Sequence, residues 1–296
     1  MLCEHGGRTL TAVMVVGGAL LALIAPGAGA QPPPSGSALL DGCVSVNANP
    51  GVPDENIRYL VPAEFTLATE PDPTDPGEER VPLSIGATHC DEVTVQRANG
   101  QTSTQETVYA AFRVPLANTP QGETETFVRT YQLWLVSNNR NLISLLREEG
   151  GEEGRGAVFL PDLAWDLSFD DPTQPVQDFT FEVQSPRAPS HFRIDATVGR
   201  PLPVPRQRYT AGHFSTNERG WMVIDGAFTL TGLGLARGQV TAAPGSQLAQ
   251  VLCGEDGSFS DPIGTAAFER DDIAVTVRPR DTQPTPRAQC PPPDAS

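Results

Sequence analysis

The segment that decides the fold runs from Tyr131 to Gly151 and reads YQLWLVSNNRNLISLLREEGG. Its first part belongs to a predicted strand over residues 127–136, which ends in the apolar cluster Leu133-Trp134-Leu135-Val136. Asn138 or Asn139 can cap a helix that follows, because an Asn side chain accepts hydrogen bonds from the free N–H groups of a helix start. This helix has an apolar stripe, Leu142, Leu145 and Leu146, and a glycine stop, Gly150-Gly151. The segment predicts a buried strand that leads into a short amphipathic helix.

Strands dominate the rest of the chain. Apolar and polar side chains alternate in several stretches, which places one face of each strand toward a core. The predicted strands are residues 107–114, 163–169, 179–183, 192–198 and 273–277, with a bulge at Gly232-Leu233-Gly234 in a further strand over 228–240. A second helix is expected from Gln247 to about Leu252, capped by Ser246. The sequence predicts an α+β fold, mostly β: a large antiparallel sheet or barrel-like β domain with two short helices.

The ends of the chain look different from this domain. Residues 1–30 carry Arg8, an apolar run and the small residues Ala28-Gly29-Ala30, as in a secretory signal peptide. We expect a Pro/Gly/Ser-rich tether over 31–42, a single β-rich domain over 43–290 and a disordered tail over 291–296. Residues 69–80 read as an acidic, proline-rich surface loop. With no membrane-spanning run after the leader, we expect a secreted or extracytoplasmic protein, in the periplasm or at the cell exterior.

Four cysteines follow the predicted leader: Cys43, Cys90, Cys253 and Cys290. An even number in an oxidising compartment indicates two disulfides, for which three connectivities exist. We favour Cys43 with Cys90 and Cys253 with Cys290, because each pair is local and would fix one end of the chain. A zinc site is the alternative, although only one histidine, His89, stands next to a cysteine.

The charged residues restrict the chemistry. All twenty basic side chains are arginine, and the net charge is -16. Without lysine the chain cannot form a Schiff base through an ε-amino group. Without a basic run it is not expected to bind nucleic acid. The histidines show no metal-ligand spacing, so we predict no metal and no cofactor.

The segment from Tyr131 to Gly151 resembles the strand-turn-helix of the acetoacetate decarboxylase family, in which an aromatic strand leads into a turn, a small helix and a Gly-Arg-Glu element. Looser similarity extends over about residues 107–277. The resemblance implies that Arg147 holds a ligand carboxylate and that Glu148 relays a proton. The chain departs from the family at Leu146, which stands where the family has glycine, and in lacking the lysine that forms the imine. The apolar periodicity selects Glu149 as the alternative, because it follows Leu145 by four residues.

Two functions fit these features. The first is a secreted acetoacetate decarboxylase-like domain that binds, and processes without a Schiff base, a small oxo-acid or carbonyl compound in a central cavity. A carboxylate in the last helical turn suits proton transfer, because the negative end of the helix dipole favours its protonated form. The alternative is a non-enzymatic extracellular or envelope β-domain protein in which Glu148 and Glu149 belong to a solvated acidic loop. A secreted hydrolase would require His191 or His213 beside a serine and an acid. The sequence leaves the ligand, the oligomeric state and any protein partner open.

Overall fold

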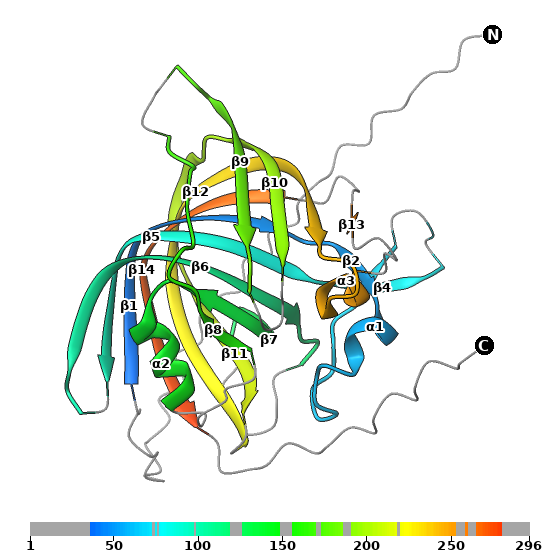
Figure 1. Cartoon of the computed structure of the whole chain (residues 1–296), viewed down its shortest axis with the longest axis horizontal. Helices are drawn as coiled ribbons and strands as arrows, with labels where there is room; N and C mark the ends of the chain where they lie inside the picture. The colour runs from blue at the N-terminus through cyan, green and yellow to red at the C-terminus, as the bar shows by residue number, and fades with distance from the viewer. Residues whose placement is uncertain are drawn as a thin grey trace, which may run out of the picture. The chain divides into compact units, whose positions relative to one another are not determined.

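The computed structural model describes residues 36–72, 75, 77–97, 99–118, 126–148, 156–169, 173–185, 191–217, 220–252, 258–259 and 265–279 (Figure 1). The predicted signal peptide and tail, Cys253, Cys290, Glu149 and the Gly150-Gly151 helix stop lie outside these residues. None of the helices in the described part of the chain is long and apolar enough to cross a membrane.

The described residues form three short helices and fourteen strands. The helices are α1 (Asp54–Arg58), α2 (Arg140–Glu148) and α3 (Gln247–Val251). The strands are β1 (Gly36–Ala48), β2 (Gly51–Pro53), β3 (Glu70–Pro71), β4 (Glu79–Pro82), β5 (Ser84–Arg97), β6 (Thr102–Pro115), β7 (Val128–Ser137), β8 (Ala157–Phe159), β9 (Val176–Val183), β10 (Phe192–Gly199), β11 (Leu202–Asn217), β12 (Gly220–Ala242), β13 (Ser258–Phe259) and β14 (Thr265–Pro279).

The large sheet closes on itself. Its strand order is β11-β7-β6-β5-β1-β14-β12-β10-β9, and β12 also pairs with β11, so the strands from β11 to β12 form a ring (Figure 1). The long strand β12 makes this closure: residues from Gly220 to Leu233 pair with β11, and residues from Ala236 to Ala242 pair with β10 on the same edge. The predicted mostly-β, barrel-like α+β fold is confirmed.

Bulges in the barrel strands allow two side chains to face inward together where strict alternation would place them on opposite faces of the strand. On β14 the pairing with β12 skips between Asp271 and Ala274, and Asp272 adopts a left-handed backbone with φ 51°. As a result Arg270 and Ile273, three positions apart, both line the barrel interior. On β7 a register shift has the same effect for Gln132 and Leu135. The predicted bulge near Gly232 is present, because the β12–β14 register also shifts between Leu230 and Gly232.

The barrel wall is packed on both sides. One apolar cluster covers its outside and includes Phe112, Phe179 and Phe181, together with residues of α1 and α3. A second cluster lies inside and includes Leu135 and the apolar stripe of α2, which packs against β1, β5, β7 and β8. Burial on both faces explains why β6 reads as a nearly continuous apolar run after Glu106.

Both predicted helices have the expected caps. For α2 the structure selects Asn139, whose Oδ1 accepts hydrogen bonds from the N–H groups of Asn141 and Leu142 at 3.0 Å each. Its amide nitrogen donates to Thr107 Oγ1 at 2.8 Å, which ties the helix start to β6. For α3, Ser246 Oγ accepts from the N–H of Ala249 at 3.1 Å. These contacts fix α2 at one end of the barrel interior.

The disulfide Cys43–Cys90 joins β1 to β5, as predicted. The two residues are directly opposite in the antiparallel register, with Cα atoms 4.0 Å apart. Gly42, which precedes the first cysteine, has φ 58°, a left-handed conformation that glycine adopts without steric penalty.

Four expectations need correction. Residues 163–169 form no strand: Leu163 and Leu167 are buried and their neighbours exposed, so the alternation is real, but no ladder pairs the segment. The predicted tether overlaps the barrel, because β1 begins at Gly36 and residues 36–40 pair with both β5 and β14. The sheet is not wholly antiparallel, since β7 runs parallel to β11 and β8. In addition to these corrections, helix α1 is an element that no sequence pattern had predicted.

The fourth correction concerns the predicted surface loop over residues 69–80. Its ends pair as β3 and β4, which form a separate small sheet with β2. Asp72, only 3% exposed, forms an ion pair with Arg80, which lies directly across the hairpin from Glu70. The run of acids and prolines thus contains a specific ion pair and short strands, where the composition suggested only a solvated loop.

Candidate functional site: a cavity inside the barrel

A cavity of about 400 Å³ lies inside the barrel, within the range of small-molecule sites (roughly 300–1,000 Å³). Every strand of the closed ring contributes to its lining, and α2 contributes Leu142 and Leu146. Apolar lining residues that belong to the inner cluster include Leu40, Leu135 and Ile273. The polar part contains Tyr109, Arg113, Thr130, Gln132, His213 and Arg270.

Aromatic rings mark one route into this cavity. Phe127 lines it although its side chain is 71% exposed, so the cavity reaches the surface there. The Phe127 ring contacts Tyr209 at a centroid distance of 4.6 Å, and Tyr209 stacks on Phe228 at 5.4 Å. The Cζ atom of Arg270 lies 5.6 Å from the Phe228 centroid. A row of rings therefore leads from solvent to a guanidinium group inside the barrel.

Arg113 on β6 is a cation without an ion-pair partner among the described residues. Its backbone pairs with Ser84 on β5 and Gln132 on β7, and its side chain lines the cavity. The Nε atom is buried and makes no hydrogen bond. Burial lowers the pKa of this guanidinium, Tyr109 acts in the opposite direction, and the charge of Arg270 lowers the pKa further. Arginine nevertheless stays protonated in proteins, so this position carries an uncompensated positive charge.

Arg270 on β14 is held more firmly. One terminal nitrogen donates to Ser45 Oγ at 2.6 Å, and the rings of Phe228 and Phe268 flank the guanidinium. Its Nε atom is also buried without a partner, and burial lowers its pKa. The cation–π contacts and the Ser45 bond orient this group and leave most of its five N–H donors available.

His213 on β11 completes the polar lining. Its Nδ1 atom lies 2.7 Å from Thr130 Oγ1 on the parallel neighbour β7. Burial, then the charges of Arg113 and Arg270, hold the pKa of His213 well below its usual value of 6.5. The ring is therefore neutral at pH 7. Its Nε2 atom can donate to a ligand when Nδ1 accepts from Thr130, or accept when Nδ1 donates.

The chemistry of this lining is that of an anion receptor. The lining residues of the cavity described here include two arginines and neither Asp nor Glu. A guanidinium presents its donors in a planar fork that matches a carboxylate in two parallel hydrogen bonds. The neutral His213 and the hydroxyl and amide groups of Thr130 and Gln132 can bind an uncharged oxygen of the same ligand.

The predicted site residues are only partly located. Arg147 and Glu148 form the last turn of α2, directly after Leu146, which lines the cavity. Their side chains are not in the described part of the structure, and Glu149 lies outside it altogether. The roles expected of Arg147, Glu148 and Glu149 therefore stay predictions. The inner residues Arg113, His213 and Arg270 were not expected as site residues.

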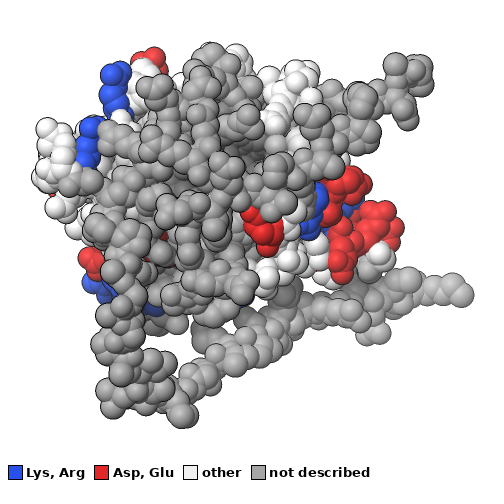
Figure 2. Space-filling model, turned by 90° about the horizontal axis from the view of Figure 1, so that it is seen from below, with Lys and Arg blue, Asp and Glu red and all other residues white. Residues whose placement is uncertain are grey.

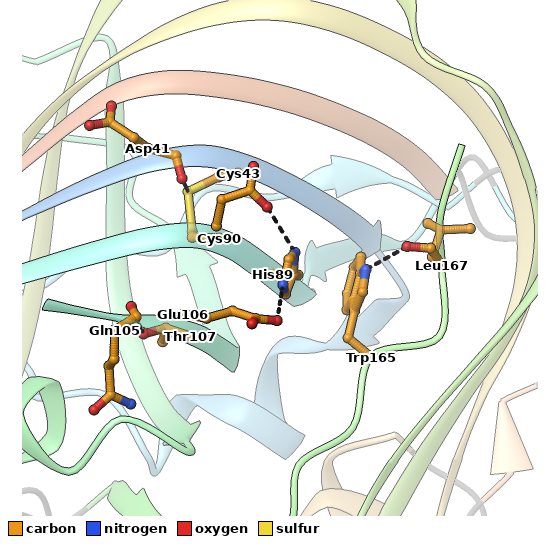
Figure 3. A network of polar contacts seen from close by, with 10 residues as sticks. Asp41, Cys43, His89, Cys90, Gln105, Glu106, Thr107, Trp165 and Leu167 are labelled. Atoms are coloured by element: carbon orange, nitrogen blue, oxygen red, sulfur yellow. Dashed lines mark hydrogen bonds and ion pairs between the residues drawn. A yellow bond between two sulfur atoms is a disulfide. The ribbon is translucent and has the colours of Figure 1, made fainter. Parts of the chain in front are cut away.

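Among the described residues, neither His191 nor His213 contacts both a serine and an acid, as a hydrolase triad requires. His213 contacts Thr130 and responds to two arginine charges, while His191 is exposed before β10. His89 belongs to a separate network on the outer barrel wall, shown in Figure 3. Its Nε2 atom lies 2.8 Å from Glu106 Oε1, and its ring stacks on Trp165 at 5.8 Å. This network attaches the unpaired segment 163–169 to the barrel.

The surface has the opposite charge from the cavity. On the face shown in Figure 2, acidic side chains gather at one side of the described surface, as the net charge of -16 leads one to expect. Long-range electrostatic attraction therefore does not favour anions outside the barrel. The cavity features that favour an anion are therefore local: the positions of Arg113 and Arg270.

No protein-family model matches the chain, and no curated protein sequence does. Solved structures are similar. An acetoacetate decarboxylase matches with TM-score 0.50 and 11% identity, over 84% of this chain and 88% of that chain. An acetoacetate decarboxylase from Legionella pneumophila gives TM-score 0.48 and 12% identity, over 83% and 86% of the two chains. The enduracididine biosynthesis enzyme MppR, complexed with the condensation product of pyruvate and imidazole 4-carboxaldehyde, gives 0.47 and 12%, over 85% and 90%.

The first of these matches establishes the architecture: the chain has an acetoacetate decarboxylase-like fold, as its resemblance to that family implied. At 11% identity the likeness concerns the fold alone, because one fold supports many activities. Function has to be argued from the cavity and its residues.

Proposed function

We propose that this protein binds a small organic acid, an oxo-acid or a similar carbonyl carboxylate, in the barrel cavity. The observation that carries the proposal is Arg113, a cation that lines the cavity without a hydrogen-bond partner among the described residues. An unpaired charge in such a place is unfavourable for folding, so a ligand that supplies the missing carboxylate is the simplest reason for it. The alternative of an envelope protein without a ligand predicts no enclosed pocket, and the cavity counts against it.

Processing of the ligand is the second part of the proposal. Because the chain contains no lysine, loss of carbon dioxide from a 3-oxo acid would proceed without an imine. The electron pair of the breaking carbon–carbon bond would pass to the ketone oxygen, and arginine or His213 would stabilise the resulting enolate by hydrogen bonding. A protonated Glu148 would then return a proton to carbon and recover its own from water.

A panel of 3-oxo acids tests both parts. Saturable thermal stabilisation together with carbon dioxide release above the spontaneous rate would identify an enzyme, and stabilisation alone a binding protein. Arg113→Gln should remove both signals, and Glu148→Gln only the release of carbon dioxide. Absence of stabilisation and of carbon dioxide release with every acid would overturn the proposal.

We also infer that the mature protein acts outside the cytoplasm after removal of residues 1–30. The leader-like sequence and the Cys43–Cys90 disulfide support this, because disulfides persist mainly in oxidising compartments. Mass spectrometry of protein isolated from a secreting host should find Gln31 at the amino terminus. A chain that stays in the cytoplasm with its first thirty residues would contradict the inference.

A further inference from the structure

The two cavity arginines come from different strands of the barrel. Around the closed ring, β6 and β14 are separated by β5 and β1 in one direction and by β7, β11 and β12 in the other. Arg113 is on β6 and Arg270 on β14, and both side chains line the same cavity. In a barrel of this size the interior holds side chains or one small ligand, so both guanidinium groups can reach the same bound molecule.

Neither charge is neutralised by the described protein. Arg113 makes no side-chain hydrogen bond there, and Arg270 makes one to an uncharged hydroxyl, that of Ser45. The two like charges also disfavour one another, as the effect of Arg270 on the pKa of Arg113 indicates. A ligand with one negative charge would leave one positive charge in the cavity, whereas two negative charges would balance both.

The polar groups between the arginines lie on the β7 and β11 side of the ring. Thr130 and Gln132 on β7 and His213 on β11 line the cavity there. Since His213 is neutral, this part of the wall suits an uncharged oxygen such as a ketone rather than a third charge. In ring order, the lining thus presents a charge on β6, neutral polar groups on β7 and β11, and a second charge on β14.

We propose that the ligand of this cavity is a short oxo-dicarboxylate, with one carboxylate bound by Arg113, the other by Arg270 and the oxo group facing His213. This inference rests on the proposed function and specifies its ligand class. Two carboxylates fit better than a doubly charged single head such as a phosphonate, because the two cations come from strands that β5 and β1 separate. The apolar residues of the lining, Leu135, Leu142 and Leu146, contact the carbon chain.

A matched pair of probes tests the charge requirement. Glutarate and glutaramate have the same shape, but the second carries an amide in place of one carboxylate. Titration calorimetry should give at least about a tenfold lower Kd for glutarate, because one charge-assisted interaction is lost in glutaramate. In Arg270→Gln this preference should fall to about twofold or less, and 3-oxoglutarate should bind the wild type more tightly than glutarate does.

The experiment also needs a control for folding and a second variant that perturbs the cavity less than Arg270→Gln does. Ser45→Ala removes the hydrogen bond that orients Arg270, together with the one between Ser45 and Thr88, but keeps the guanidinium. It should therefore reduce the glutarate preference by a smaller factor than Arg270→Gln. Thermal unfolding verifies that both variants fold. If Arg270→Gln does not fold, the test uses Ser45→Ala and the comparison of glutarate with glutaramate on the wild type.

The outcomes separate the two proposals. Equal affinity for glutarate and glutaramate, or an unchanged preference in folded Arg270→Gln, overturns the dicarboxylate inference and leaves binding of a monocarboxylate intact. Methylphosphonate binding as tightly as glutarate would also overturn it, because both charges would then lie on one head. If neither these acids nor 3-oxobutanoate binds, the proposed function itself fails.

Discussion

At the scale of single residues, the feature that demands explanation is positive charge inside a barrel whose surface is acidic. Arg113 illustrates it, because the described protein offers its guanidinium neither a carboxylate nor a hydrogen bond. Residues selected for binding often reduce the stability of the unliganded protein, since their groups are arranged for a partner that is absent. Arg113 should therefore be unfavourable for folding and necessary for binding.

Replacement of Arg113 by methionine should stabilise the ligand-free protein. Loss of the unpaired charge should raise the free energy of unfolding by about 1–3 kcal/mol, equivalent to roughly 2–4 °C in Tm for each kcal/mol. Differential scanning calorimetry measures this, with Arg208→Met at an exposed position of β11 as the matched control, expected within about 0.5 kcal/mol of wild type. A large destabilisation by Arg113→Met would mean that Arg113 has a structural role.

His213 should make stability depend on pH. Because its folded pKa lies well below 6.5, mainly through burial, the unfolded chain binds the proton more readily. Its contribution to stability is complete above pH 6.5 and is lost as pH falls from there through the folded pKa. Glu269 acts in the opposite direction, since burial raises its pKa above 4.5.

Urea unfolding between pH 7.5 and 5 checks this expectation. The free energy of unfolding should fall less steeply with decreasing pH in His213→Gln than in the wild type. The same change at the exposed His191 should leave the slope unaltered. Identical slopes in wild type and His213→Gln would show that His213 titrates normally.

At the scale of elements, the bulge on β14 determines which way Arg270 points. Asp272 has φ 51°, a conformation that disfavours most L-residues by about 1–2 kcal/mol and that glycine adopts freely. Its N–H donates to Asp41 Oδ1 at 3.0 Å, which ties the bulge to β1. Without the bulge, Arg270 and Ile273 would face opposite sides of the barrel wall.

Substitutions at Asp272 should therefore differ in stability according to how well each residue tolerates a left-handed backbone. Asp272→Gly should match or exceed wild-type stability, and Asp272→Val should lower the free energy of unfolding by about 2 kcal/mol, because β-branched residues tolerate a left-handed backbone poorly. Urea unfolding and organic-acid titration of both variants are the measurements. If Val is tolerated as well as Gly and binding is unchanged, the bulge does not hold Arg270 in place.

The disulfide is the other element-scale device, because it joins β1 to β5 across a separation of 47 residues. Loop-closure entropy attributes about 4 kcal/mol to a bridge of this length. The double variant Cys43→Ala/Cys90→Ala should lose most of that amount in urea unfolding. Peptide mapping of the oxidised wild type should recover Cys43 linked to Cys90, and recovery of Cys43 linked to Cys253 or Cys290 would contradict the pairing.

At the scale of the whole molecule, sequence patterns predicted the individual helices and strands better than they predicted how the sheet closes into a barrel. The caps of α2 and α3 follow from Asn139 and Ser246, because capping depends on neighbouring residues only. Residues 163–169 alternate like a strand yet pair with none, since alternation reports burial and not hydrogen bonding. Residues 36–42 were assigned to a tether because Gly and Ser there conceal the pairing with β5 and β14.

The inner site was harder to predict for a physical reason. β6 is buried on both faces, so its sequence does not reveal that Arg113 points inward. Arg270 stands among Glu269, Asp271 and Asp272 and reads as part of a solvated charged run. The only available signal was a single arginine between Phe112 and Val114, and its meaning depends on a ring of strands that local sequence does not encode.

The central claim is that an organic acid binds inside the barrel through Arg113. The most direct measurement is titration calorimetry of the full mature chain with 3-oxobutanoate and 3-oxoglutarate, for the wild type, Arg113→Gln and the surface control Arg208→Gln. The account predicts saturable binding of at least one acid to the wild type and to Arg208→Gln, and at least a tenfold weaker affinity in folded Arg113→Gln. Equal affinity of Arg113→Gln and the wild type, or no binding of either acid to the wild type, would contradict it.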